Sequence, residues 1–223
     1  MGIRWLARFS SVLGLVAGLA AWPAAAQDDD PAAQAALRTP EQLARALECR
    51  SRDGYFAIGM ALIGKDRPSW LSETPDNGHP GMLGLESFQL AAPITVFGER
   101  IDRVSFLNQW VVAELPRATA LKVIAQQTMD RAPIRATEQY YHFIDDGAGP
   151  MLGAFEPTDD ALEVAFGGAP KARGPSPTLF VGCNYAPMSK AAFLDAARQA
   201  DAFLGKANHD IRKMVEDAPA PKR

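Results

Sequence analysis

The feature that most restricts the fold is a succession of four strand-length segments in the middle of the chain. Each is rich in β-branched or aromatic residues, and the breaks between them have the composition of turns. The segments are 88–92, 94–97, 101–107 and 110–115, separated by Pro93, Gly98–Glu99 and Asn108–Gln109. Strands that follow one another with such short breaks are typical of an antiparallel meander, which we predict here.

Three helices are predicted around this meander. The first begins with TPEQ at 39–42, which places a hydroxyl at the N-cap, a proline at the first helical position and a glutamine three residues after the cap. The second follows Pro116, and the third is capped by Ser189 and expected to stop at Gly205. Apolar residues recur at helical spacing in all three: Leu43, Ala46 and Leu47; Leu121, Ile124, Ala125 and Thr128; Phe193, Ala196, Ala197, Ala200, Phe203 and Leu204.

Four further segments are predicted as strands, with linkers rich in glycine and proline between them. The strands are 55–63, 138–144, 161–166 and 178–185, and the linkers are 64–85, 145–160 and 167–177. The order of helix then strands occurs twice, at 39–115 and 117–185, which suggests a duplicated α-β unit without a residue-level repeat to support it. The predicted fold class is α+β, a mostly antiparallel sheet with helices packed on one face.

The first 26 residues have the charge order and ending of an export signal. Arg4 and Arg8 precede the apolar run 11–22, and alanines at 24–26 precede the expected cleavage point before Gln27. The apolar run is shorter than the roughly 20 residues that span a bilayer. We therefore predict a cleavable signal peptide at 1–26, a periplasmic or secreted location, and no stable membrane insertion after cleavage.

Composition divides the rest of the chain into three parts. Residues 27–38 are acidic and alanine-rich, and we predict that they form a flexible spacer. Residues 39–205 are predicted to form a single α+β domain. Residues 206–223 are predicted to contain a short amphipathic piece at 211–215 and a disordered tail.

The charge of the chain argues against nucleic acid as a partner. Cleavage of 1–26 removes two of the 23 basic residues and none of the 26 acidic ones, so the net charge falls from −3 to near −5. Nucleic-acid binding requires a concentrated basic face. The two basic clusters, at 171–173 and 221–223, are better explained by solubility.

Cys49 and Cys183 are the two cysteines of the chain. Thiol pairs tend to close in the oxidising compartment that an exported chain enters, so we predict one disulfide that joins the first helix to the last strand. Two buried free thiols and a redox pair are the alternatives. The C-x-x-C spacing typical of redox pairs is absent.

His142 is the candidate for a catalytic residue, because it is the one histidine on a predicted strand, where it shares a face with Tyr140. His79 lies in the long loop and His209 near the C-terminus. The alternative interpretation of His142 is a half-buried strand histidine without a catalytic role. No G-x-S-x-G or S-x-x-K motif supplies a nucleophile for a serine hydrolase.

The sequence offers little support for glycan hydrolysis or metal binding. Distant carboxylates can meet in a fold to hydrolyse glycans, and the acids considered are Glu86, Glu114, Asp145, Glu156 and Glu163. His142 with Asp145 and Asp146 is the nearest approach to a metal site, but the paired spacings of zinc ligands and the calcium loop are absent. We predict no metal and no cofactor.

Trp70 and Phe155 are the large side chains that lie in predicted loops rich in glycine and proline. Tryptophan and other aromatic residues are enriched at binding centres, so these two are the candidates for partner contact. The favoured function is non-catalytic binding or inhibition of an envelope protein or cell-wall component through long loops. The alternatives are an envelope hydrolase that uses distant carboxylates or His142, and a structural or assembly module marked by an exposed apolar patch or an unpaired strand edge.

Overall fold

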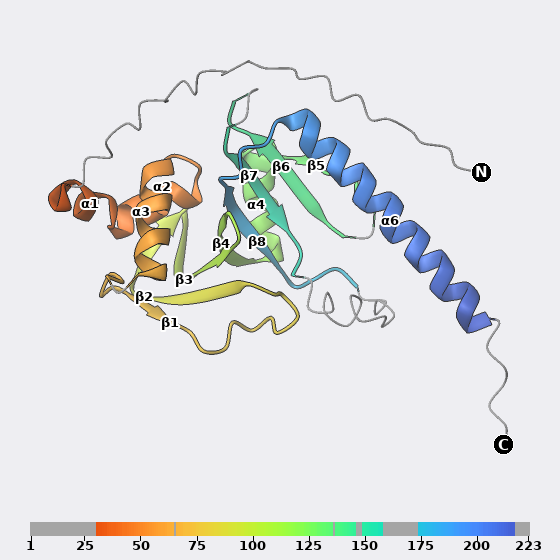
Figure 1. Ribbon diagram of the computed structural model, residues 1–223, viewed down its shortest axis with the longest axis horizontal. Helices are drawn as coiled ribbons and strands as arrows, with labels where there is room; N and C mark the ends of the chain where they lie inside the picture. The colour runs from red at the N-terminus through yellow and green to blue at the C-terminus, as the bar shows by residue number, and fades with distance from the viewer. Residues whose placement is uncertain (1–29, 65, 136, 146–148, 158–173, 217–223) are drawn as a thin grey trace, which may run out of the picture.

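The computed structural model describes residues 30–64, 66–135, 137–145, 149–157 and 174–216; within 204–216 it describes the helix but not the side chains. Eight strands lie in these residues: β1 (Leu71–Glu73), β2 (Leu85–Val96), β3 (Glu99–Leu107), β4 (Trp110–Pro116), β5 (Asp130–Arg131), β6 (Gln139–Phe143), β7 (Met151–Phe155) and β8 (Thr178–Asn184). They form one antiparallel sheet in the order β1-β2-β3-β4-β8-β7-β6-β5 (Figure 1). The predicted α+β class and the antiparallel meander are confirmed. The predicted break at Pro93 is wrong, because Pro93 lies in a bulge within the single strand β2, and the turn before β3 lies at Phe97–Gly98 and not at Gly98–Glu99.

In the described residues, five helices accompany the sheet. They are α1 (Pro31–Leu37), α2 (Pro40–Leu47), α3 (Arg52–Ile63), α4 (Arg117–Gln126) and α6 (Lys190–Glu216). The predicted start of the second of these is confirmed, because the Thr39 hydroxyl accepts a hydrogen bond from the main-chain nitrogen of Gln42 at 3.2 Å. Leu43, Ala46 and Leu47 are fully buried, as the apolar spacing predicts.

The hairpin between β2 and β3 shows why the meander closes so tightly. Its two turn residues, Phe97 and Gly98, have φ angles of 54° and 81°. Two consecutive positive φ angles are the signature of a type I′ turn, whose twist matches that of the flanking strands. Glycine adopts this conformation without strain, and the main-chain nitrogen of Phe97 is held by the Glu48 carboxylate at 2.9 Å.

The main core lies between one face of the sheet and helices α2 and α4. Leu47 of α2 and Val123 of α4 belong to the same buried cluster as Val111 of β4 and Val181 of β8. In both halves of the described chain, helices precede four antiparallel strands: α1, α2 and α3 precede β1–β4, and α4 precedes β5–β8. The two sets of strands meet at the β4–β8 pair. The duplication hypothesis is supported by this order of elements and not by a residue-level repeat.

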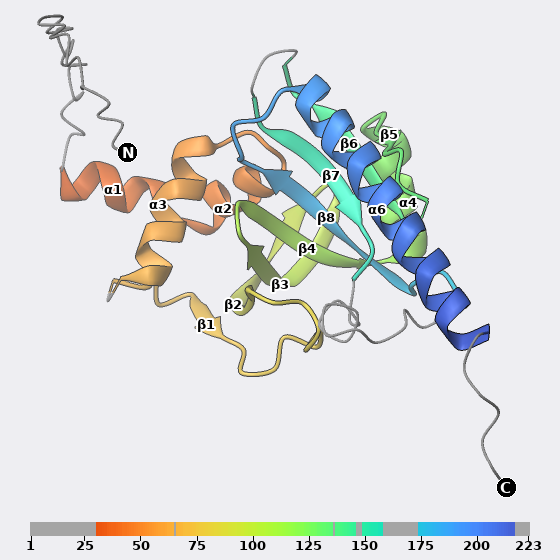
Figure 2. The same ribbon diagram turned by 45° about the vertical axis from the view of Figure 1, so that its right-hand side comes forward.

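Helix α6 packs on the opposite face of the sheet from α2 and α4 (Figure 2). Its Phe193 joins a small cluster with Tyr141 of β6 and Met151 of β7. Leu152, the neighbour of Met151, belongs to the main core instead, as the alternation of side chains along a strand requires. The prediction that helices pack on one face thus holds for α2 and α4 but not for α6.

The predicted disulfide is present. Cys49, just after α2, and Cys183 of β8 have their sulfur atoms 2.01 Å apart. They are 134 residues apart in the sequence, so the bond links the first helical region to the last strand, as predicted. The Tyr185 hydroxyl, two residues after Cys183, adds a hydrogen bond to the carbonyl of Ala46 at 2.9 Å.

The prediction of a strand at 55–63 is wrong, because this segment belongs to helix α3. The Ser51 hydroxyl caps the helix by accepting from the main-chain nitrogen of Gly54 at 3.2 Å. Tyr55, Ile58 and Ala61 are buried, which is a helical spacing. A short apolar run is compatible with both a strand and a buried helix. Here the N-cap at Ser51, which precedes the run, favours the helix.

Three predicted irregular segments contain regular structure. The linker at 64–85 includes β1, which pairs with β2. The linker at 145–160 includes β7, which pairs with β6 and β8. The spacer at 27–38 includes α1, which contacts α3 although none of its residues is buried. Short apolar or alanine-rich stretches of this kind gain their structure from neighbours that are remote in sequence.

The C-terminal helix also departs from the prediction, because it passes Gly205 and reaches Glu216, through the piece predicted at 211–215. The predicted signal peptide at 1–26, the predicted strand at 161–166 and the part of the predicted tail from 217 lie outside the described residues. None of the helices in the described part of the chain has the length and hydropathy of a membrane span.

Candidate functional site

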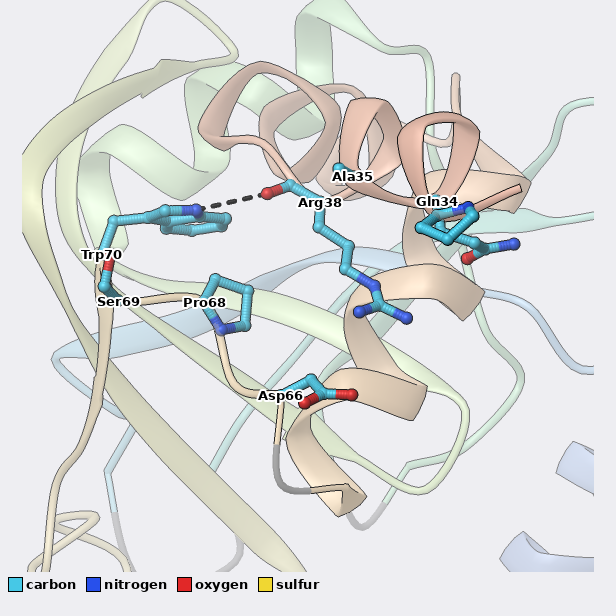
Figure 3. Close-up of a pocket in the computed structure, with 8 residues that line it drawn as sticks. Gln34, Ala35, Arg38, Asp66, Pro68, Ser69 and Trp70 are labelled. Atoms are coloured by element: carbon cyan, nitrogen blue, oxygen red, sulfur yellow. Dashed lines mark hydrogen bonds between the residues drawn. The ribbon is translucent and has the colours of Figure 1, made fainter. Parts of the chain in front are cut away.

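Trp70 lies where the chain turns from α3 into the edge strand β1. The main-chain nitrogen of Leu71 donates to the carbonyl of Pro68 at 3.0 Å, which forms the turn. The carbonyl of Trp70 accepts from Ala91 of β2 at 2.9 Å. Its indole nitrogen donates to the carbonyl of Arg38 at 3.2 Å. The half-buried indole is therefore fixed in position between α1 and the sheet (Figure 3).

Two depressions share Trp70 as a wall, and together we call them the Trp70 site. The first has a volume of about 470 Å³ and lies against α1. The second has a volume of about 410 Å³ and lies between α2 and β2. The first is lined by Pro31, Gln34, Ala35, Arg38, Asp66, Pro68, Ser69 and Trp70, and the second by Pro40, Glu41, Ala44, Trp70, Ala91, Ala92, Pro93, Ile94 and Thr95.

Arg38 is the one basic residue among those that line the two depressions. Figure 3 shows its side chain extending from the end of α1 toward the wall formed by Pro68 and Asp66. Its Nε atom is buried and has no hydrogen-bond partner. None of the ion pairs among the described residues involves Arg38, and Asp66 is exposed on the opposite wall. A buried guanidinium nitrogen without a hydrogen-bond partner lowers the stability of the protein.

The sheet edge beside the second depression is protected against pairing with another strand. β1 pairs with β2 only up to Leu90. The register of β2 against β3 shifts between Gln89 and Ile94, and Pro93 lies within this bulge. Bulges and prolines at an edge block strand addition. The Trp70 site is therefore suited to contacts made by side chains and not to extension of the sheet.

Phe155 does not lie in a loop, contrary to the prediction, but at the end of β7. Its ring packs against Trp110 and Phe180, with centroids at 5.1 Å and 5.5 Å. These rings belong to a buried cluster on the face opposite the main core. The prediction that Phe155 contacts a partner was based on a loop position, and the structure does not place Phe155 in a loop.

His142 is half-buried on β6, paired with Leu152 of β7. Its predicted strand position is confirmed. No described residue forms a hydrogen bond or ion pair with its side chain. A general base needs a partner that orients its ring, and the described surroundings of His142 do not supply one.

Of the two histidines whose side chains the structure describes, His79 has a carboxylate partner, although its loop position did not make it a candidate in the sequence. It is only 8% exposed, and its Nε2 lies 3.2 Å from Oε2 of Glu114. The other oxygen of Glu114 accepts from the Thr178 hydroxyl at 2.6 Å, and the His79 ring meets the edge of Phe180 at 5.1 Å. The sequence holds one hint of this position, the polar turn D-N-G-H, in which Asn77 and Asp76 cap the nitrogens of His79 and Gly78.

A second polar cluster lies at the start of α4. Arg117 forms ion pairs with Glu138 and Glu156, and the Tyr140 hydroxyl donates to Glu138 at 2.6 Å. Burial alone raises the pKa of Glu138, but the hydrogen bonds from Tyr140 and Arg117 outweigh it and lower the pKa. Burial and the bond to Glu138 raise the pKa of Tyr140. Because these groups satisfy one another, the cluster stabilises the fold and leaves no free acid for catalysis.

The remaining candidate acids do not gather into a site. Glu86 and Asp145 are exposed, whereas Glu163 and Asp146 lie outside the described residues. Within the described part of the chain, no group of three or more histidine, cysteine or acidic residues could hold a metal ion.

Helix α3 carries an exposed apolar row. Phe56, Met60 and Ile63 are 46%, 64% and 84% exposed, and their spacing places them on one helical face. The guanidinium of Arg52 lies 5.6 Å from the centre of the Phe56 ring. This row is the kind of exposed patch that the assembly alternative requires.

Comparisons with protein-family models, with curated protein sequences and with solved structures found no match to this chain.

Proposed function

We propose that this chain is an exported, non-catalytic binding protein that holds an extended polypeptide segment of another envelope protein at the Trp70 site. The observation that carries the proposal is the position of Trp70. A hydrogen bond from its indole nitrogen holds the half-buried ring, and the ring forms a wall of both depressions. A rigid aromatic side chain between two hollows is a common centre of binding energy.

The lining favours a polypeptide as the ligand. Prolines and alanines make up much of both walls: Pro31, Ala35 and Pro68 in the first depression, and Pro40, Ala44, Ala91, Ala92 and Pro93 in the second. Small apolar and rigid residues form a site that is shaped before binding, which reduces the entropic cost of association. Two adjacent hollows suit side chains of one segment that crosses Trp70.

The proposed location outside the cytoplasm follows from the predicted signal at 1–26. The disulfide between Cys49 and Cys183 supports it. Structural disulfides persist in oxidising compartments outside the cytoplasm. We therefore propose that the protein binds its partner in the periplasm or outside the cell.

The test begins with site-specific cross-linking in cells. A photoreactive residue in place of Gln34, which lines the first depression, is expected to capture the partner, whereas one in place of Leu83, which is 70% exposed outside the site, is not. The captured partner is then purified, and its dissociation constant is measured by calorimetry. We expect Trp70→Ala to weaken binding about 30-fold, as for a binding hot spot, and Leu83→Ala to leave it unchanged.

Two results would overturn this proposal. One is an unchanged dissociation constant for Trp70→Ala. The other is capture of a cell-wall glycan instead of a polypeptide at Gln34, which would make the Trp70 site a carbohydrate platform.

The second candidate function is an assembly module in which α3 packs against a second copy of this chain. The exposed row of Phe56, Met60 and Ile63 supports it, because apolar rows at this spacing pack well between helices. Light scattering of the purified protein tests it. A dimer that Met60→Glu converts to a monomer supports the candidate, and a wild-type monomer at high concentration rejects it.

A further inference from the structure

The Trp70 site contains a cation that forms no ion pair with any residue that the structure describes. The Nε atom of Arg38 is buried without a hydrogen-bond partner, and no carboxylate of a described residue lies within ion-pair distance of its guanidinium. By contrast, Arg117 and Arg135 are paired with acids, at Glu138 and Asp201.

A carboxylate is the group that best completes this arrangement. A guanidinium presents several N–H donors in a plane, and it binds carboxylates in a bidentate geometry. Trp70 lies beside Arg38 and is held by the carbonyl of the same residue, so one ligand segment can contact both. We therefore propose that Arg38 recognises the carboxylate of an acidic side chain in the segment that crosses Trp70. This inference rests on the proposed function and specifies its ligand.

The continuity of the site favours a side-chain carboxylate over a chain terminus. Arg38 lines the first depression, and the second begins on the other side of Trp70. A segment that occupies both hollows and continues beyond the first presents a side-chain carboxylate, and not a terminal one, to the guanidinium.

The other charges of the site limit how acidic the segment is. Asp66 lines the first depression with Arg38, and Glu41 lines the second. Like charges repel one another. The site therefore selects a segment with an isolated acidic residue and disfavours a run of acids.

The test uses three short peptides and the protein as the cell produces it. The first is acetyl-Ala-Pro-Glu-Pro-Ala-amide, the second replaces its glutamate by glutamine, and the third is the glutamine peptide with a free C-terminal carboxylate. Binding is followed by NMR through the indole N–H resonance of Trp70, which is assigned by its loss in Trp70→Phe. The resonance of Trp110, which lies in a separate cluster, is the internal control.

We expect the glutamate peptide to bind at least about tenfold more tightly than the glutamine peptide, the range expected for a charge-assisted hydrogen bond. The Arg38→Gln variant should bind the two equally, since it removes the cation but keeps the carbonyl that holds Trp70. The exposed Arg45 of α2 is the matched control, and Arg45→Gln should keep the full preference.

Several results would overturn the inference. They are equal binding of the glutamate and glutamine peptides by the wild type, an undiminished preference in Arg38→Gln, tighter binding of the peptide with the free C-terminus, and no response of Trp70 to any peptide. If Trp70→Ala abolishes binding of the partner while Arg38→Gln retains binding, the proposed function stands and this inference fails. If both variants keep the partner, both fail.

Discussion

The indole nitrogen of Trp70 donates a hydrogen bond at 3.2 Å to the main-chain oxygen of Arg38, 32 residues earlier in the chain. This contact joins the end of α1 to the start of β1 and fixes the ring that both depressions share. The polar edge of the ring is occupied by the protein, so its apolar surface is what a ligand can contact. Trp70 thus combines a structural bond with the proposed binding role.

Trp70→Phe separates these two roles. It keeps an aromatic ring but removes the N–H donor, and we expect a loss of about 1 kcal/mol in the free energy of unfolding. Urea denaturation measures it. Leu83→Ala, at an exposed position, should change stability by less than about 0.5 kcal/mol. A Trp70→Phe variant as stable as the wild type would show that the bond to Arg38 contributes nothing.

Removal of the disulfide should destabilise the fold strongly. The bond closes a loop with a sequence separation of 134 residues, and loss of a native disulfide typically costs about 2–5 kcal/mol. We expect the Cys49→Ala/Cys183→Ala variant to unfold at lower urea concentration. Reductant should shift the wild type to the same midpoint and leave the variant unchanged. A variant with the midpoint of the oxidised wild type would contradict this expectation.

Stability should fall in acid partly through Glu138. Its pKa in the folded protein lies below the ordinary value of 4.5, because hydrogen bonds from Tyr140 and Arg117 outweigh burial. A lowered folded pKa stabilises the protein above the unfolded value, and this contribution is lost as the pH falls below 4.5 through the folded pKa. Melting temperatures between pH 7 and pH 3 measure it.

Glu138→Gln tests this assignment. The variant should lose about 1–3 kcal/mol at pH 7, because Arg117 loses one of its two charged partners, and it should show a weaker decline below pH 4.5. Glu86→Gln, at an exposed position of β2, removes the same charge without this partner and should keep the wild-type profile. An identical acid decline in wild type and Glu138→Gln would assign it to other groups.

Two glycine substitutions should have opposite effects. A Cβ atom at Gly153 of β7 would lie 2.7 Å from Cη2 of Trp110 and 2.9 Å from the carbonyl of Tyr140. Gly153→Ala should therefore destabilise the protein by about 1–3 kcal/mol. At Gly59, within α3, a Cβ meets nothing within 4 Å, and Gly59→Ala should stabilise it by about 1 kcal/mol. Thermal melting compares the two, and a stable Gly153→Ala would contradict the close packing of Trp110.

The candidate site was predicted from the sequence only in part. Trp70 was singled out because it lies in a long loop rich in glycine and proline, and the structure places it between two depressions. Arg38 was not predicted, because it lies in the segment expected to be a flexible spacer. Phe155 was selected by the same loop argument, but β7 gains its structure from pairing with β6 and β8, which local composition does not show.

Features that depend on neighbouring residues were determined by the sequence alone. The start of α2 at Thr39 and the turn at Asn108–Gln109 follow from a cap and a break within a few residues, and a chain with two cysteines can form one internal disulfide. Only the tertiary structure decided that 55–63 is helical, that α6 covers the second face of the sheet, that His79 meets Glu114 and that Trp70 bonds to Arg38. These outcomes depend on burial and hydrogen bonds between residues remote in sequence, and local propensity is weaker than those contacts.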